Sequence, residues 1–208
     1  MFKQIKFFFQ QSWLLITSAV IFGLLLAYVN AEWQPRIIQN EIDKFNNLAK
    51  GLLTEAHEFT TPQGLEEVSL KNAKGKITKT QIKQAMDPDG NSIGWAFVCK
   101  GSGFADKIKL VVALDANCEK LAGFGVLFSN ETVGFGDKIS IKKGFFQSQF
   151  MGAPVEELTL TKTGDDKKID NKIVAITGAT VSSEAVVKIL NDNVRKVKNI
   201  LKEKGLIR

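Results

Sequence analysis

A charge-free apolar stretch near the N-terminus constrains this chain more than any other feature. Residues 7–31 contain no charged residue, and residues 13–29 are strongly apolar. A helix needs about 20 such residues to cross the hydrocarbon core of a bilayer. The stretch therefore predicts a single transmembrane helix, with residues 1–33 as an N-terminal membrane anchor.

The charges on either side of this stretch predict its orientation. Two lysines precede it and three acidic residues follow it: Lys3 and Lys6, then Glu32, Glu41 and Asp43. Basic flanks stay in the cytoplasm, so we expect a single-pass protein of the cytoplasmic (inner) membrane with an extracytoplasmic C-terminal domain. The alternative is a cleaved signal peptide ending at Val29-Asn30-Ala31, but the apolar core is long for one.

The remaining composition is typical of one globular domain. The chain has 208 residues, of which 44% are hydrophobic and 24% charged, and these proportions suit a folded domain rather than a disordered tail. The formal net charge is +6. This excess is spread along the sequence without a lysine–arginine block or interleaved aromatic residues. We therefore expect no nucleic-acid partner.

Residues 34–60 predict an amphipathic stalk helix. Pro35 suits the first turn of a helix. Apolar residues then recur at spacings of three and four, in a pattern that continues to about Phe59: Ile38, Ile42, Phe45, Ala49 and Leu52. Such a helix would lift the following domain off the membrane and pack its apolar side on that domain's sheet.

Residues 61–208 predict an α+β domain with a mainly antiparallel sheet flanked by helices. The clearest signal is a hairpin, because two strand-like runs at 107–115 and 120–128 are joined by a polar loop. Shorter strands are expected at 68–70, 77–82, 95–100 and 157–162, and another starts at Ile173.

Helical signals lie in the second half of this domain. Residues 144–150 predict a short helix or turn that buries three aromatic residues in the core: Phe145, Phe146 and Phe150. A final amphipathic helix is expected to start at Ser182 or Ser183, to run to about Lys204 and to stop at Gly205.

Reactive side chains are few. Cys99 and Cys118 show no metal-ligand spacing, so no metal site is expected. They could form a disulfide outside the cytoplasm, or they could be one buried strand cysteine and one loop cysteine. The single histidine, His57, has no evident catalytic partner. Because no acid–base or nucleophile–base pair is evident, we expect no substrate conversion by this chain alone.

A hydroxyl-rich motif near the C-terminus carries the chemistry. The apolar run 173–176 ends in Thr177-Gly178-Ala179-Thr180, and Val181-Ser182-Ser183 follows. This pattern predicts a strand, a tight glycine turn and the start of a helix. Such a turn presents hydroxyls and unpaired backbone N–H groups at one point, where a phosphate can bind. The alternative is ordinary N-capping, which needs only one hydroxyl.

The motif resembles the flavinylation motif of the FMN-binding domains in Rnf and Nqr electron-transport complexes. In that family the last threonine carries FMN through a phosphoester bond, so the resemblance implies covalent FMN on Thr180. It also implies that the neighbouring motif residues surround the cofactor: Thr177, Gly178, Ala179, Ser182 and Ser183. The family usually has an aspartate three residues before the first threonine, where this chain has Val174.

A second segment strengthens the resemblance. Residues 131–138, Glu-Thr-Val-Gly-Phe-Gly-Asp-Lys, resemble the family's Glu-Thr-Pro-Gly-Leu-Gly-Asp-Lys segment. Two glycines flanking an aromatic residue let the backbone approach a ligand closely. In the family this loop lies against the flavin. The resemblance therefore places four residues around the flavin ring: Glu131, Thr132, Gly134 and Phe135.

The order of anchor, loop and motif resembles the RnfG component of Rnf complexes more than its longer Nqr counterpart. The resemblance implies an electron-transfer component of a translocase, a ferredoxin:NAD oxidoreductase coupled to Na⁺ or H⁺ movement. The implied partners are a second covalent-FMN membrane protein of the complex, iron–sulfur membrane proteins, cytoplasmic proteins that handle ferredoxin and NAD, and a flavin transferase. Two alternatives stay open: the NqrC component of an Na⁺-translocating NADH:quinone reductase, and a flavin-free membrane-anchored binding or assembly module.

Overall fold

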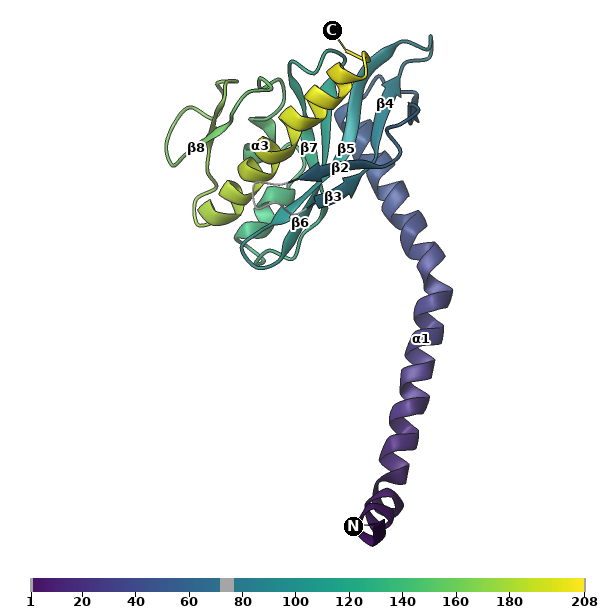
Figure 1. Ribbon diagram of the computed structural model, residues 1–208. Coiled ribbons are helices and arrows are strands. Elements are labelled where there is room, and N and C mark those ends of the chain that lie inside the picture. Colours follow the sequence, from purple (N-terminus) through teal and green to yellow (C-terminus); the bar gives the residue numbers. More distant parts are fainter. Residues whose placement is uncertain (1, 72–76, 208) are drawn as a thin grey trace. The chain divides into compact units, whose positions relative to one another are not determined.

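The computed structural model describes residues 2–71 and 77–207 (Figure 1). By its internal contacts the chain forms two compact units, residues 1–43 and residues 44–208. The predicted division into an anchor to residue 33, a stalk to residue 60 and a domain beyond it stays a prediction.

The first helix, α1, runs without interruption over Phe2–Leu52 and contains Pro35. Its apolar part is long enough to cross a membrane, and none of that part is buried in the protein. The expectation of a separate helix starting at Pro35 was wrong, because the apolar residues before it are themselves helical. A proline removes one backbone hydrogen bond, which a long helix can tolerate.

The helix also ends earlier than the expected position near Phe59. Beyond Leu52 the His57 N–H donates to the Met86 carbonyl at 2.8 Å. This bond draws the chain into the sheet, where β1 (Glu58–Thr60) pairs with β4 (Ile82–Met86). Pairing with the sheet therefore prevails over the helical periodicity of the sequence.

The central sheet has five strands in the order β1-β4-β5-β6-β7, and every neighbouring pair is antiparallel. The three long strands are β5 (Ser92–Ser102), β6 (Lys107–Asp115) and β7 (Leu121–Phe128). The expected hairpin is confirmed as β6 and β7. The prediction of an α+β domain with a mainly antiparallel sheet is confirmed as well.

Two small sheets flank the central one. Strands β2 (Val68–Lys71) and β3 (Ile77–Thr80) pair antiparallel, whereas β8 (Thr159–Thr161) and β9 (Lys172–Val174) pair parallel. The single strand expected at 77–82 is thus divided, since β3 ends at Thr80 and β4 begins at Ile82. Ile82 is fully buried and pairs with the central sheet, which explains the break.

Helices cover both faces of the central sheet. The face that carries Trp95 and Phe97 packs against α3 (Thr180–Glu203), shown in yellow in Figure 1. The other face carries Ala96 and Val111. It packs against the end of α1 through three residues: Phe45, Leu48 and Ala49. Side chains alternate across a strand, so neighbouring residues such as Trp95 and Ala96 serve opposite layers.

Three aromatic rings close the core near the short helices η1 (Gly136–Ser140) and α2 (Phe145–Ser148). The rings of Phe124, Phe146 and Phe150 meet edge-to-face at 4.9–6.2 Å between centroids. The expectation that Phe145 is also a core residue was wrong, because 47% of it is exposed. A one-turn helix cannot direct consecutive side chains to the same side.

Both cysteines are free thiols, buried in the domain, so the disulfide alternative is not realised. Cys99 lies in β5 and Cys118 in the loop before β7. Burial and the Asp115 charge raise the pKa of Cys118 to about 12, and burial raises the pKa of Cys99.

This burial predicts slow alkylation of the folded protein. The raised pKa leaves Cys118 with about a thousandfold less thiolate at pH 8 than an exposed cysteine, and the thiolate is the reactive form. We expect neither cysteine to react with iodoacetamide in the native protein within an hour, and both to react in guanidinium chloride. Mass spectrometry counts the adducts, and rapid labelling of native Cys118 would contradict the buried placement.

Candidate functional site

The chain passes from β9 into α3 through a hydrogen-bonded glycine turn. Gly178 has a φ of +80°, a conformation that glycine adopts without strain. The Ser183 hydroxyl accepts from the Ile176 N–H at 3.1 Å and donates to the Ala179 carbonyl at 2.9 Å. The serine thus ties the strand side of the turn to the helix, and the predicted strand–turn–helix order is confirmed.

The helix begins at Thr180, earlier than the expected Ser182 or Ser183. Its first internal bond runs from the Ser183 N–H to the Ala179 carbonyl at 3.0 Å. Ala179 is the N-cap residue, and no side chain caps the helix there. The backbone N–H groups at the start of α3 therefore lack the partner that the N-capping alternative would have supplied.

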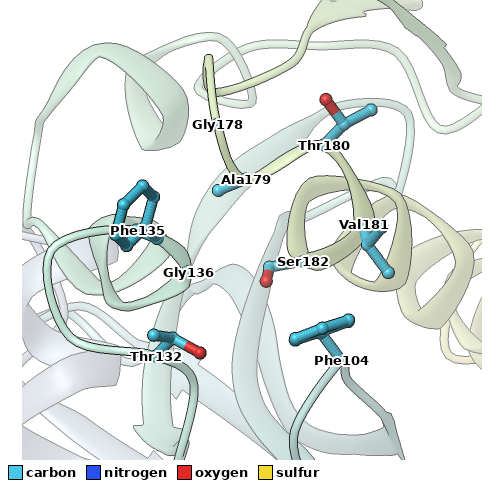
Figure 2. A pocket seen from close by; sticks show the side chains of 9 residues that line it. All are labelled: Phe104, Thr132, Phe135, Gly136, Gly178, Ala179, Thr180, Val181 and Ser182. Atoms are coloured by element: carbon cyan, nitrogen blue, oxygen red, sulfur yellow. The ribbon is translucent and has the colours of Figure 1, made fainter.

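A pocket of about 270 Å³ opens at this end of α3. It is formed by the turn into α3, by the loop before η1 and by the turn after β5. Figure 2 shows the nine residues that line it: Phe104, Thr132, Phe135, Gly136, Gly178, Ala179, Thr180, Val181 and Ser182.

The structure brings most of the predicted site residues together at this pocket. Six of them line it: Thr132, Phe135, Gly178, Ala179, Thr180 and Ser182. Glu131 lies behind the lining, bonded to Ser182, and Ser183 is buried in the turn. Thr177 and Gly134 are exposed and are not among the lining residues. The assignment of all ten to FMN stays a prediction.

Three lining residues escaped the sequence prediction. Gly136 and Val181 belong to the two segments that carried the resemblance, so only their roles were missed. Phe104 comes from the turn between β5 and β6, where 66% of it is exposed. The Gly-Ser-Gly-Phe sequence at residues 101–104 marked a break in the strand, and an aromatic residue beside such a break was the available signal.

The Thr180 hydroxyl is accessible for chemistry. The residue is half-buried, and Figure 2 shows its oxygen on the rim of the pocket, pointing away from Ser182. Its neighbours Gly178 and Ala179 are small. Within residues 2–71 and 77–207, the Thr180 hydroxyl takes part in no hydrogen bond.

The pocket suits the parts of FMN. None of the nine lining residues carries a charge, so attraction for a phosphate there comes from the N–H groups and positive end of α3. Figure 2 shows the rings of Phe104 and Phe135 on different sides of the opening, where they offer apolar surface to a planar ring. The volume is at the lower end for ligand pockets, so part of a bound flavin would remain accessible to a redox partner.

Gln149 holds the strand that leads into this turn. Its side chain is 2% exposed. It accepts from the Val174 N–H at 2.7 Å and donates to the Val174 carbonyl at 3.1 Å. Val174, at the position where the family usually has aspartate, is thus fixed through its backbone.

We expect Gln149→Ala to destabilise the domain by about 2–4 kcal/mol, because two buried backbone groups of Val174 lose their partner. The exposed Gln63→Ala is the matched control and is expected to change stability by less than about 0.5 kcal/mol. Guanidinium chloride unfolding in detergent measures both. Equal stability of the two variants would show that the Val174 backbone finds other partners.

Comparison with known proteins agrees with this site. Residues 103–195, which include every lining residue, match the model of the FMN-binding domain family. The fold and the pocket therefore define an FMN-binding domain.

The relatives narrow this class. The chain is 31% identical to the G-type component of the ion-translocating oxidoreductase complex of Methanosarcina acetivorans, over 87% of this chain and 89% of that protein. It is 26% identical to the corresponding G-type component of the proton-translocating ferredoxin:NAD(+) oxidoreductase complex of Clostridium ljungdahlii, over 88% of each. The chain belongs to the RnfG family, the G-type components of ion-translocating oxidoreductase complexes.

Among solved structures, NqrC of Shewanella oneidensis has the same fold. Its TM-score is 0.56 at 20% identity, over 72% of this chain and 73% of that one. At this identity the likeness concerns the fold alone, so it does not favour the NADH:quinone reductase alternative over RnfG.

Proposed function

We propose that this chain is the electron-transfer component of a membrane-bound, ion-translocating ferredoxin:NAD oxidoreductase complex, and that it holds FMN covalently on Thr180. The observation that carries the proposal is the meeting of the 131–136 loop and the 178–182 turn at one pocket, with the Thr180 hydroxyl on its rim. The RnfG relatives support the assignment to an oxidoreductase complex.

Each part of the pocket has a role in this proposal. The N–H groups at the start of α3 would hold the phosphate, and the helix dipole adds roughly 0.3–1 kcal/mol when exposed. Phe104 and Phe135 would contact the ring. FMN supplies the transfer of one or two electrons, while the protein supplies position and environment.

Covalent attachment prevents loss of the cofactor outside the cytoplasm. In the ester, the Thr180 oxygen replaces the leaving nucleotide on the phosphorus of an activated flavin dinucleotide. The hydroxyl proton is released with that nucleotide, and a flavin transferase would catalyse the exchange. With no cationic side chain in the lining, reversible binding of a phosphate would depend on the helix terminus alone, so the tether has a clear advantage.

Flavin fluorescence in a denaturing gel tests the proposal and excludes the flavin-free module or supports it. The chain is produced in its native host, or together with its flavin transferase, and is separated under denaturing conditions. We expect a band that fluoresces under ultraviolet light at the 23.0 kDa of this chain. A dark band from an active complex would favour the flavin-free binding or assembly module.

The membrane topology is part of the proposal. Lys3 and Lys6 before the apolar stretch favour a cytoplasmic N-terminus, with the FMN domain outside. Alkaline phosphatase is active only outside the cytoplasm, so its fusion after residue 207 is expected to be active. An inactive phosphatase with an active cytoplasmic reporter at the same position would reverse the topology.

The specific partners are also proposed. Affinity purification of this chain from native membranes is expected to recover a second covalent-FMN protein, iron–sulfur membrane proteins and the proteins that handle ferredoxin and NAD. Recovery of a quinone-reducing complex would instead favour the NADH:quinone reductase alternative.

A further inference from the structure

Glu131 is a buried carboxylate directly behind the pocket. The residue is 6% exposed, and the family resemblance assigned it to the flavin ring. Its side chain instead points into the protein, where Oε1 accepts from the Phe104 N–H at 2.9 Å and from the Ala105 N–H at 3.1 Å. Its other oxygen, Oε2, accepts from the Ser182 hydroxyl.

These bonds join the three segments that form the pocket. Phe104 belongs to the turn after β5, Ser182 to the first turn of α3, and Glu131 itself to the loop before η1. The first turn of α3 also carries Thr180. A single side chain therefore fixes the helix that bears the attachment residue relative to the turn that bears Phe104.

The surrounding glycines show how closely Glu131 is enclosed. A Cβ on Gly103 would lie 2.3 Å from Glu131 Oε1. A Cβ on Gly136 would lie 2.6 Å from the Ser182 Oγ and 2.9 Å from the Glu131 Cβ. Neither position can accept a larger residue without displacing the carboxylate.

The charge of Glu131 has a second consequence. None of the lining residues is cationic, so no positive side chain in the lining offsets this carboxylate. Two electrons and one proton leave a reduced flavin with one more negative charge than the oxidised form. A nearby carboxylate in a poorly solvated place disfavours that gain of charge.

We propose that Glu131 is a positioning residue that aligns Thr180 with the Phe104 turn, and that its charge lowers the reduction potential of the flavin. The inference rests on the proposed attachment of FMN to Thr180. Ser182 is then bound to Glu131 and does not donate its hydroxyl proton to the phosphate.

Two variants separate position from charge. Glu131→Gln keeps an oxygen that can accept from Phe104 and Ala105 and an amide that can donate to Ser182, but it removes the charge. Ser182→Ala keeps the charge and removes one bond. Glu184→Gln is the matched control, because Glu184 is exposed on the same helix and its substitution makes the same change in charge.

The test uses full-length protein produced with its flavin transferase. Intact mass gives the covalent FMN content, and dithionite, as the electron donor, gives the midpoint potential at alkaline pH. We expect the flavin of Glu131→Gln to have a more positive potential than that of the wild type or Glu184→Gln. We expect Ser182→Ala to load FMN about tenfold more slowly, the effect of losing roughly 1.4 kcal/mol of alignment.

Each result bears on one part of the inference. A Glu131→Gln potential equal to that of Glu184→Gln overturns the role of the charge. Wild-type loading rates in both Glu131→Gln and Ser182→Ala overturn the positioning role. A wild-type protein without flavin on Thr180 overturns the proposed function together with this inference, whereas a loaded wild type with unaffected variants overturns the inference alone.

Discussion

Replacing Thr180 by alanine is expected to remove covalent FMN from this chain completely. The variant lacks the only oxygen that the proposed ester uses, and the pocket otherwise keeps its shape because the Thr180 hydroxyl bonds to no other residue of the described segments. Electron transfer from ferredoxin to NAD through the assembled complex should fall by at least about 100-fold, since a missing redox centre breaks the chain of carriers.

The control for this prediction is Thr180→Ser. Serine keeps a hydroxyl on the same backbone atom, so fluorescence in a denaturing gel is expected to persist, although at a lower content. Thr177→Ala tests the other threonine of the motif, which is exposed and away from the pocket lining. Flavin retained on the Thr180→Ala chain would assign the attachment to another residue.

Replacing Phe150 by alanine is expected to cause the largest loss of stability. Phe150 is fully buried, and its ring meets those of Phe124 and Phe146 at 4.9 and 5.1 Å between centroids. Truncating such a ring leaves a cavity and costs about 3–5 kcal/mol. The melting temperature in detergent should therefore fall by roughly 10 °C or more.

Phe145→Ala is the matched control for this variant. Phe145 lies in the same short segment but is 47% exposed, so its removal should shift the melting temperature by only a few degrees. Similar losses for the two variants would contradict the placement of Phe150 at the centre of the aromatic cluster.

Local patterns predicted the elements whose stability is local. The β6–β7 hairpin could be predicted because alternating residues and a polar loop specify it without distant partners. The turn into α3 could be predicted because glycine and a β-branched run mark it. The end of α1 could not, since the bond from His57 to Met86 joins segments that are far apart in the sequence.

The site shows the same division. The motif and the 131–138 segment indicated where FMN binds, because their residue types are those that a phosphate and a ring require. Phe104 and the bonds of Glu131 escaped prediction, since only the folded chain brings residues 104, 131 and 182 together. The start of α3 was misplaced because the Ser183 hydroxyl bonds backwards to the turn instead of capping the helix.

The mass of the peptide that contains Thr180 tests covalent FMN attachment most directly. The protein is taken from its native membranes in an active complex, digested and fragmented by mass spectrometry. Residues 177–188 are expected to carry the added mass of one FMN ester, localised to Thr180. An unmodified peptide from a complex that still transfers electrons would contradict the attachment and the electron-transfer role that depends on it.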